Sequence, residues 1–317
     1  MTSYLAPGKL ILSGEYSVLF GYPAVVLSIN KYLKISIENS QRLQIEVYGI
    51  RLVGKFNKIA NDIYSLSPHT YETLKFFSEE GIDLDNLSIK ITSTIPFKGL
   101  GSSAALITCL SYALLDFLGY QISKEDLLLK TYRIKKHVEG GSPTDLVASI
   151  FGGINLVRYN NEKIYHERLP KDVFKEKGIK LYAIYSGEKA VTKEIIKNVK
   201  INLEKIKYKK KIIESMGRLT NNIWDILKHE DLDGLFRFVR LNHYLLASFG
   251  VSTKNIDKIV NSLEETSRGE AVAKISGAGF GDSLIALSKN GRDICEKIEK
   301  IECVNVDIDM QGVRKIK

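Results

Sequence analysis

The sequence predicts a soluble α+β protein with two domains, and three observations support this prediction. The chain has 317 residues, which is enough for two domains of ordinary size. Its 44% hydrophobic and 26% charged residues are the proportions of a globular protein rather than a disordered chain. Strand-like and helix-like segments follow one another irregularly, which indicates largely antiparallel sheets instead of a regular parallel β-α-β alternation.

The elements of the first half are predicted from apolar spacing and from the glycines and prolines that bound each run. Short apolar or alternating runs predict strands at residues 9–12, 24–29, 33–38, 44–48 and 87–91. Apolar residues at spacings of three and four predict helices at residues 63–79 and 124–137. Another helix is expected to begin after the glycine-rich turn at residues 99–103 and to run to residue 118.

In the second half the same patterns predict strands at residues 153–158, 180–185, 271–276, 283–287 and 304–309. Helices are expected through most of residues 192–249, at 254–267 and at 291–301. A charged stretch at residues 160–177 separates the halves, so we expect domains of residues 1–165 and 166–317.

The formal net charge of +9 is compatible with binding nucleic acid or with attracting polyanionic metabolites. The densest basic run, residues 207–211, lies on a helical pattern whose lysines should mostly face the solvent. No zinc-finger spacing or RNA-binding motif accompanies it. No apolar run approaches the roughly 20 residues that span a bilayer, and the N-terminus has no secretory pattern. We therefore expect a cytoplasmic protein that binds neither nucleic acid nor membrane.

The three cysteines, Cys109, Cys295 and Cys303, are widely spaced and form no CxxC pair. An odd number of cysteines without clustered histidines favours neither a disulfide framework nor a zinc site. We expect buried or half-buried free thiols.

The segment 99–105, Gly-Leu-Gly-Ser-Ser-Ala-Ala, lies between a predicted strand and an apolar helix. Glycines let the backbone approach a phosphate closely, and a helix N-terminus offers unpaired N–H groups and a favourable dipole. The hydroxyls of Ser102 and Ser103 can bond phosphate oxygens or a magnesium ion. An ordinary turn with a serine N-cap is the alternative, and the lysine of a Walker A loop is absent after these glycines.

Two further segments combine glycines with charged residues. Residues 7–18 place Lys9 before an apolar strand and Glu15 at its end. Residues 274–283, Lys-Ile-Ser-Gly-Ala-Gly-Phe-Gly-Asp-Ser, set a glycine cluster between two strand-like runs. A hairpin turn alone rarely needs so many glycines, so we expect the backbone to approach a ligand there.

Together these three segments resemble, in order and spacing, the three signature motifs of the GHMP kinases, a superfamily of ATP-dependent kinases of small molecules. Residues 141–153, Gly-Ser-Pro-Thr-Asp-Leu-Val-Ala-Ser-Ile-Phe-Gly-Gly, add a fourth match, to the S-x-x-D…GG segment of mevalonate and phosphomevalonate kinases. The resemblance implies an N-terminal domain with a left-handed β-α-β unit, a ferredoxin-like C-terminal domain and an active site between them.

The same resemblance implies roles for individual residues. Contacts with the ATP phosphates fall on Gly99, Leu100, Gly101, Ser102, Ser103 and Ala104. Catalysis falls on Asp145, the usual base, and on Lys9 beside it, although Asp145 could equally be a helix N-cap. Mg²⁺ is expected on Ser103 and on an acidic residue upstream of Asp145. Glu139 is the candidate for that residue, or else a solvated residue at a helix end.

Within the superfamily, three features resemble phosphomevalonate kinases. They are Tyr16, where mevalonate kinases usually have histidine, Lys98 directly before the phosphate loop, and Gly281-Asp282 in the third motif. A substrate that already carries a phosphate needs an added cation, which Lys98 supplies. We therefore expect transfer of the ATP γ-phosphoryl group to 5-phosphomevalonate, with Asp145 needed less as a base than to position Lys9.

Two other functions stay open. Residues 242–253 resemble a helix and turn of mevalonate kinases, which makes phosphorylation of mevalonate the alternative reaction. A catalytically inactive sensor or nucleic-acid-binding protein is an alternative of another class, against which the joint presence of Lys9, Ser103 and Asp145 argues. Candidate substrate contacts in or near the matching segments are Tyr16, Ser17, Lys98, Ser142, Thr192, Gly277, Ala278 and Gly279. The sequence does not indicate an oligomeric state.

Overall fold

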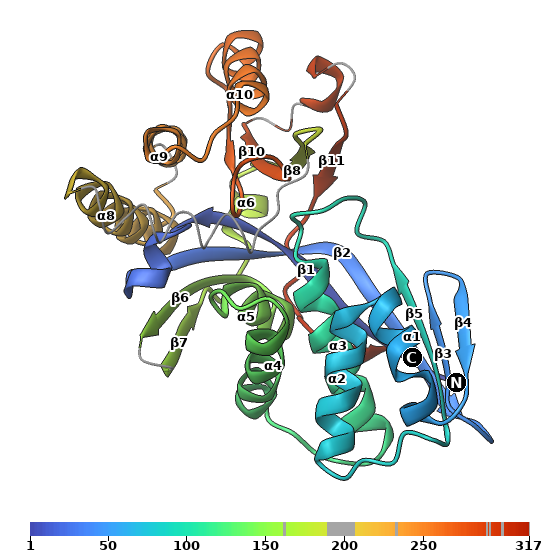
Figure 1. The fold of residues 1–317 in the computed structure, drawn as a ribbon. Helices are drawn as coiled ribbons and strands as arrows, with labels where there is room; N and C mark the ends of the chain where they lie inside the picture. The colour runs from blue at the N-terminus through green and yellow to red at the C-terminus, as the bar shows by residue number, and fades with distance from the viewer. Residues whose placement is uncertain are drawn as a thin grey trace.

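Two β-sheets organise the chain in the computed structural model, and helices pack against both (Figure 1). The structure describes residues 1–160, 163–188, 207–231, 234–289, 291, 293–298 and 301–316. The two ends of the chain lie close together because the last strand pairs with the first, with Tyr4 opposite Lys315.

Within the described residues, the first sheet has eight strands in the order β12-β1-β2-β5-β3-β4, and β6 joins β2 to β7. The strands are β1 (Thr2–Ser13), β2 (Ala24–Asn39), β3 (Gln44–Val47), β4 (Ile50–Val53), β5 (Leu87–Ser93), β6 (Ile154–Asn160), β7 (Lys163–Arg168) and β12 (Arg314–Ile316). The described pairs are antiparallel apart from β3 with β5. The register of β1 against β2 shifts between Pro7 and Gly8, directly before Lys9.

The helices of the N-terminal half are α1 (Phe56–Leu66), α2 (Pro68–Glu79), α3 (Ser102–Phe117), α4 (Lys124–Val138) and α5 (Thr144–Phe151). Helices α2 and α4 begin where the side chains of Ser67 and Ser123 accept a hydrogen bond from the first turn. Helix α3 is apolar on nearly all sides because β1, β2, α2, α4 and α5 surround it (Figure 1). This burial fixes the N-terminus of α3, where the predicted phosphate loop lies.

The second sheet is antiparallel, with the order β11-β8-β10-β9 among the described strands. Its strands are β8 (Lys180–Tyr185), β9 (Ala271–Ile275), β10 (Ser283–Ser288) and β11 (Cys303–Val306). The helices of this half are α6 (Val173–Glu176), α8 (Lys207–His229), α9 (Leu235–Phe249) and α10 (Lys254–Ser267), and two short 3₁₀ helices are η1 (Ser17–Phe20) and η2 (Cys295–Lys297). Helices α9 and α10 pack against β9.

A shared apolar core joins the two sheets. Its members include Leu10, Leu12, Val25 and Leu27 of the first sheet and Leu181, Ala183 and Ile285 of the second. Strand β1 also contacts α8, α9 and β10 (Figure 1). Residues of β1 are therefore held between the two halves of the molecule, which is where Lys9 lies.

The predicted two-domain α+β fold is confirmed, but two predicted helices are wrong. The single helix expected at residues 63–79 is two helices, because Pro68 starts α2 after Ser67 has left the helical conformation. The helix expected at residues 291–301 is reduced, among the residues described there, to the three residues of η2. Residues 192–206 of another predicted helix lie outside the described residues. The predicted boundary at residues 165 and 166 falls inside β7 and stays a prediction.

The prediction that all three cysteines are free thiols is wrong for two of them. Cys295 and Cys303 form a disulfide, with Cα atoms 5.3 Å apart and a sequence separation of 8 residues. Cys295 lies in η2 and Cys303 begins β11, and their spacing in the sequence alone did not reveal this contact. Cys109 is free and buried in α3, and burial raises the pKa of its thiol.

The basic run at residues 207–211 begins α8. Lys210 and Lys211 are exposed, while Lys209 places its ammonium 5.3 Å from the ring centroid of Phe249. No helix in the described part of the chain combines the length and the apolar character needed to cross a bilayer.

Candidate active site

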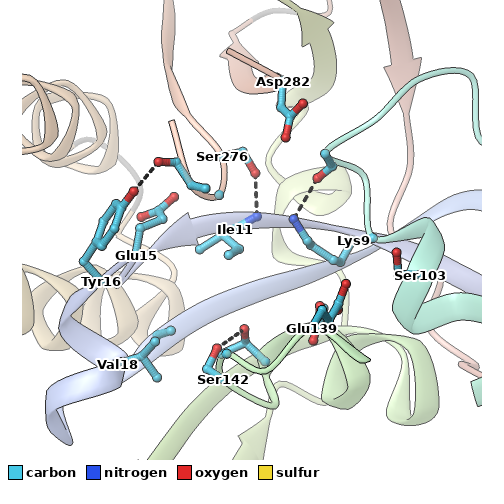
Figure 2. Close-up of a pocket in the computed structure, with 18 of the residues that line it drawn as sticks. Lys9, Ile11, Glu15, Tyr16, Val18, Ser103, Glu139, Ser142, Ser276 and Asp282 are labelled. Atoms are coloured by element: carbon cyan, nitrogen blue, oxygen red, sulfur yellow. Dashed lines mark hydrogen bonds between the residues drawn. The ribbon is translucent and has the colours of Figure 1, made fainter. Parts of the chain in front are cut away.

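A cavity of about 370 Å³ lies between β1, the start of α3, the α4–α5 loop and the turn between β9 and β10 (Figure 2). The predicted site residues that line it are Lys9, Tyr16, Lys98, Gly99, Gly101, Ser102, Ser103, Glu139, Ser142, Asp145, Gly277 and Ala278. The predicted residues outside its lining are Ser17, Leu100, Ala104 and Gly279. Thr192 lies outside the described residues. Four segments that are distant in sequence thus converge on one cavity.

Residues 99–104 form a turn that runs into the first residues of α3. Gly99 and Gly101 have φ angles of 86° and 78°, which residues with a side chain adopt at a cost. A Cβ atom on Gly101 would lie 2.7 Å from Cγ of Lys9, so close packing also requires the glycine. Gly101 is the N-cap of α3, and no described side chain caps this helix. The first N–H groups of α3 are therefore available to an anionic ligand.

Leu100 and Ala104 support this turn from behind. Both side chains are buried, and Leu100 joins the core between the sheets. The carbonyl oxygen of Leu100 accepts a hydrogen bond from the backbone N–H of Lys9 at 2.8 Å. This bond fixes the predicted phosphate loop against β1.

Lys9 directs its ammonium group towards the phosphate loop (Figure 2). Its Nζ donates a hydrogen bond to the carbonyl oxygen of Gly99 at 2.7 Å, and the residue is only 8% exposed. Burial lowers the pKa of Lys9, and the negative charge of Asp145 opposes that shift. The cavity therefore contains a buried amine beside the turn expected to hold phosphates.

Asp145 lies in the first turn of α5, whose N-cap position is Pro143, so it is not the helix cap. Its two carboxylate oxygens accept hydrogen bonds from Nζ of Lys135, each at 2.5 Å. The resemblance implied that Lys9 lies beside Asp145. Both residues line the cavity, but within the described residues the ion-pair partner of Asp145 is Lys135.

Lys135 lies on α4 and reaches the cavity from the core side. It is 5% exposed, and its Nζ also donates to the carbonyl oxygen of Ser142 at 3.0 Å. Oε1 of Glu139 lies 3.6 Å from the same nitrogen. Burial lowers the pKa of Lys135, but Asp145 and Glu139 raise it by more, so the net shift is upward.

Glu139, the predicted metal ligand, has two polar partners, His69 and Lys135. Its Oε2 lies 3.2 Å from Nε2 of His69 on α2, and its Oε1 faces Lys135. Burial raises the pKa of Glu139, but His69 and Lys135 outweigh this effect and hold it below its usual range. The side chains of His69, Glu139, Lys135 and Asp145 therefore form one connected series of polar contacts.

The residues around the cavity fit a magnesium ion that arrives with a phosphate ligand. No group of three or more histidine, cysteine, aspartate or glutamate side chains in the described part of the chain is arranged to hold a metal ion. Ser103 offers a hydroxyl in the first turn of α3 (Figure 2). Mg²⁺ usually keeps several waters and binds few protein groups together with substrate phosphates. Ser103 and a nucleotide phosphate suit that preference.

At the other end of the cavity, Glu15 and Tyr16 connect β1 to the turn after β9 (Figure 2). The Glu15 carboxylate accepts a hydrogen bond from Nζ of Lys274, and both side chains are buried. Burial raises the pKa of Glu15 and lowers that of Lys274, and each charge opposes the shift of the other. The Tyr16 hydroxyl donates to the carbonyl oxygen of Ala278. These contacts join the first and third motifs.

Ser17 and Gly279 stabilise the same region without lining the cavity. The Ser17 hydroxyl donates to the carbonyl oxygen of Gly14 at 3.2 Å. A Cβ atom on Gly279 would lie 2.3 Å from the carbonyl oxygen of Val251, so this glycine permits close backbone packing.

Sequence reasoning missed Lys135 and the Glu15–Lys274 pair. Lys135 follows Leu128 and Thr131 at helical spacing on the buried face of α4. A lysine on such a face requires a charged partner, and this signal could have identified it. Lys274 lies within β9, all of whose residues are buried, so the same signal applied there.

Comparisons with known proteins agree with this geometry. The family model described as GHMP kinases N terminal domain matches residues 68–153, and that described as GHMP kinases C terminal matches residues 223–304. The chain is 31% identical to the mevalonate kinase of Pyrococcus furiosus, over 90% of this chain and 88% of that protein. It is 32% identical to the mevalonate kinase of Thermococcus onnurineus, over 89% of this chain and 88% of that protein.

Solved structures share the fold. A crystal structure of mevalonate kinase has a TM-score of 0.82 at 24% identity and covers 98% of this chain and 99% of its own. The phosphomevalonate kinase of Streptococcus pneumoniae, in complex with phosphomevalonate and AMPPNP, has a TM-score of 0.78 at 20% identity. It covers 97% of this chain and 100% of its own.

The prediction that 5-phosphomevalonate is the acceptor is wrong. Relatives that are 31% and 32% identical over most of the chain are mevalonate kinases. The structure places two of the residues that favoured a phosphorylated acceptor as follows. Tyr16 bonds to the backbone of the third motif, and Lys98 is exposed at the rim of the cavity. The chain belongs to the GHMP kinase family.

Proposed function

We propose that this protein transfers the γ-phosphoryl group of ATP to the terminal hydroxyl of mevalonate, giving 5-phosphomevalonate and ADP. The observation that carries this proposal is the 31% and 32% identity to mevalonate kinases over about nine-tenths of the chain. The convergence of four motif segments on one cavity supports it independently.

The phosphate side of the reaction is assigned to the turn before α3. Uncapped N–H groups, the glycines at residues 99 and 101 and the hydroxyls of Ser102 and Ser103 form a suitable environment for the ATP phosphates. A magnesium ion bound with the nucleotide would neutralise the charge that develops on the transferred group. Lys98, exposed at the rim, adds a positive charge near the same phosphates.

The acceptor side is assigned to Asp145 and Lys9. A hydroxyl acceptor must lose a proton as the new P–O bond forms, so a positioned carboxylate is needed as a base. This differs from a phosphate acceptor, for which Asp145 would mainly position other groups. Asp145 faces the cavity with Lys135 on its two oxygens. Lys9 is close enough for the charge of Asp145 to affect its pKa, and its ammonium can stabilise charge on the transferred phosphoryl group.

A coupled assay of ADP release tests the proposed acceptor. Mevalonate and 5-phosphomevalonate are offered separately with Mg-ATP to the full-length protein. Turnover with mevalonate and none above background with 5-phosphomevalonate is the expected result. The reverse preference would contradict the proposal and leave the family assignment intact.

A further inference from the structure

Lys135 holds an unusual position for a lysine. It lies on the buried face of α4, one helical turn before Glu139, and its side chain is 6% exposed. A lysine carries four methylene groups that can pack in a core, but its ammonium group needs partners when it is removed from water. The partners here are the groups that face the cavity.

The ammonium of Lys135 has a partner in each direction. Two of its contacts are the carboxylate oxygens of Asp145 at 2.5 Å, and a third is the carbonyl oxygen of Ser142 at 3.0 Å. Oε1 of Glu139 lies 3.6 Å from the same nitrogen. The cation thus lies between two carboxylates, in the place where two acidic side chains would otherwise attract a metal ion.

We propose that Lys135 is the fixed counter-cation of this active site. Its ammonium bridges Asp145 and Glu139, holds the Asp145 carboxylate towards the acceptor, and occupies the position of a carboxylate-bound metal ion. Ser103, and not Glu139, would then hold a magnesium ion that is bound with the nucleotide. Lys135 is a positioning residue because it acts through Asp145.

A purely structural role fits the geometry less well. A buried ion pair contributes little net stability compared with apolar residues of similar volume, so stability alone does not explain a lysine at this position. The pair also faces the cavity instead of the interior of the domain. Ser142 and Glu139, which also contact the Lys135 ammonium, line the same cavity.

This inference rests on the proposed function for the acceptor, but its metal-binding part does not. The test uses the full-length protein with three substitutions: Lys135→Met, Lys135→Arg and Lys136→Met. The last is the matched control, because Lys136 is the exposed neighbour on the same helix. Circular dichroism and thermal melting establish that each variant is folded.

The kinetic measurement separates positioning from binding. We expect Lys135→Met to lower kcat by about 100-fold or more, the effect of a misplaced reacting group, with KM for ATP within about threefold of the wild type. Lys135→Arg keeps a cation between the carboxylates and should recover most of the lost kcat. Lys136→Met should match the wild type. A Lys135→Met variant with wild-type kcat would overturn the positioning role.

The metal measurement needs no turnover. Millimolar Mn²⁺ is added without nucleotide, and bound ion is counted by electron paramagnetic resonance. The wild type, Lys135→Arg and Lys136→Met should bind none, while Lys135→Met should gain a Mn²⁺ ion between Asp145 and Glu139. Failure of folded Lys135→Met to gain it would overturn the claim that the ammonium replaces a metal.

If Lys135→Met does not fold, Mn²⁺ binding to the wild type and to Glu139→Gln still tests the proposal. Mn²⁺ bound by the wild type without nucleotide, and lost in Glu139→Gln, would overturn the proposal. No such binding, together with unchanged Mn²⁺-ATP binding in Glu139→Gln, is the expected result. If mevalonate proved not to be the acceptor, the wild type and all variants would show no turnover with it. The Mn²⁺-binding measurement would still give its expected result, so the two failures can be distinguished.

Discussion

The proposed phosphate side and the proposed acceptor side of this cavity are built in different ways. The turn at residues 99–104 is determined by its backbone: two glycines have positive φ angles, and the N–H groups of α3 are uncapped by any described side chain. The acceptor side is determined by side chains, because Asp145 is positioned by Lys135, which comes from another helix. A site formed by the backbone can be recognised from consecutive residues in the sequence. A network of side chains depends on how separate elements pack, which consecutive residues do not show.

The largest effect on activity is expected on the acceptor side, which is formed by side chains. Asp145→Asn removes the proposed base, so we expect kcat with mevalonate to fall by about 10³-fold, within the usual range for a general base. ATP affinity, measured by equilibrium binding, should be nearly unchanged because the phosphate loop is untouched. Asp62→Asn on the exposed face of α1 is the control. A loss of ATP affinity as large as the loss of kcat would remove the distinction between the two sides.

Glu15→Gln tests how much the buried ion pair between the two halves contributes to stability, in contrast to an exposed pair. It leaves the Lys274 ammonium buried without its carboxylate, and breaking such a pair typically costs about 3–5 kcal/mol of unfolding free energy. Urea denaturation measures the change. Glu214→Gln, whose partner Arg218 is exposed, should cost less than about 1 kcal/mol. An equal loss of unfolding free energy in the two variants would mean that the buried pair contributes no more to stability than the exposed pair.

Gly101→Ala tests the backbone-built side. The new Cβ atom would meet Cγ of Lys9 at 2.7 Å in addition to the strain of a positive φ angle. We expect ATP affinity to fall by about 10–100-fold, because small displacements at a site of this kind have effects of that order. Gly49→Ala separates the two causes, since Gly49 has a φ angle of 88° but nothing within 4 Å of its Cβ position. It should lower stability by about 1–2 kcal/mol and leave ATP binding intact. Similar ATP affinities in the two variants would contradict the close-packing argument.

Lys98→Ala is expected to have the smallest effect. Lys98 is exposed, so water and salt screen its charge, and we expect KM for ATP to rise by about tenfold or less. KM for mevalonate should not change, and the effect should shrink as ionic strength increases. Lys58→Ala on α1 is the exposed control. A selective loss of acceptor binding would show that Lys98 contacts the acceptor after all.

Much of the fold could be predicted because local patterns were consistent with the packing. Strand β8 and helix α10 have the predicted bounds, since each has an apolar pattern bounded by clear turn or cap residues. The segment around η2 could not be predicted, because its apolar spacing resembles a helix while a disulfide to Cys303 joins it to β11. The spacing of apolar residues within the segment does not reveal the disulfide to Cys303.

The candidate site divides in the same way. The glycines at residues 99 and 101 were identifiable because few other residues adopt their positive φ angles or fit the close approach of Gly99 to Ser283 and of Gly101 to Lys9. The partner of Asp145 was not, because it depends on how α4 packs beside α5. The predicted acceptor was wrong because it rested on three motif features, Tyr16, Lys98 and Gly281-Asp282, whereas relatives that match most of the chain are mevalonate kinases.

The central claim is that the acceptor is a hydroxyl group and not a phosphate, and one competition measurement tests it directly. Mg-ATP, mevalonate and 5-phosphomevalonate are mixed in equal amounts with the protein, and the products are followed by ³¹P nuclear magnetic resonance. We predict that ADP and the phosphomonoester signal grow together while no diphosphate ester of mevalonate appears. Growth of a diphosphate ester at the expense of the phosphomonoester would contradict the account.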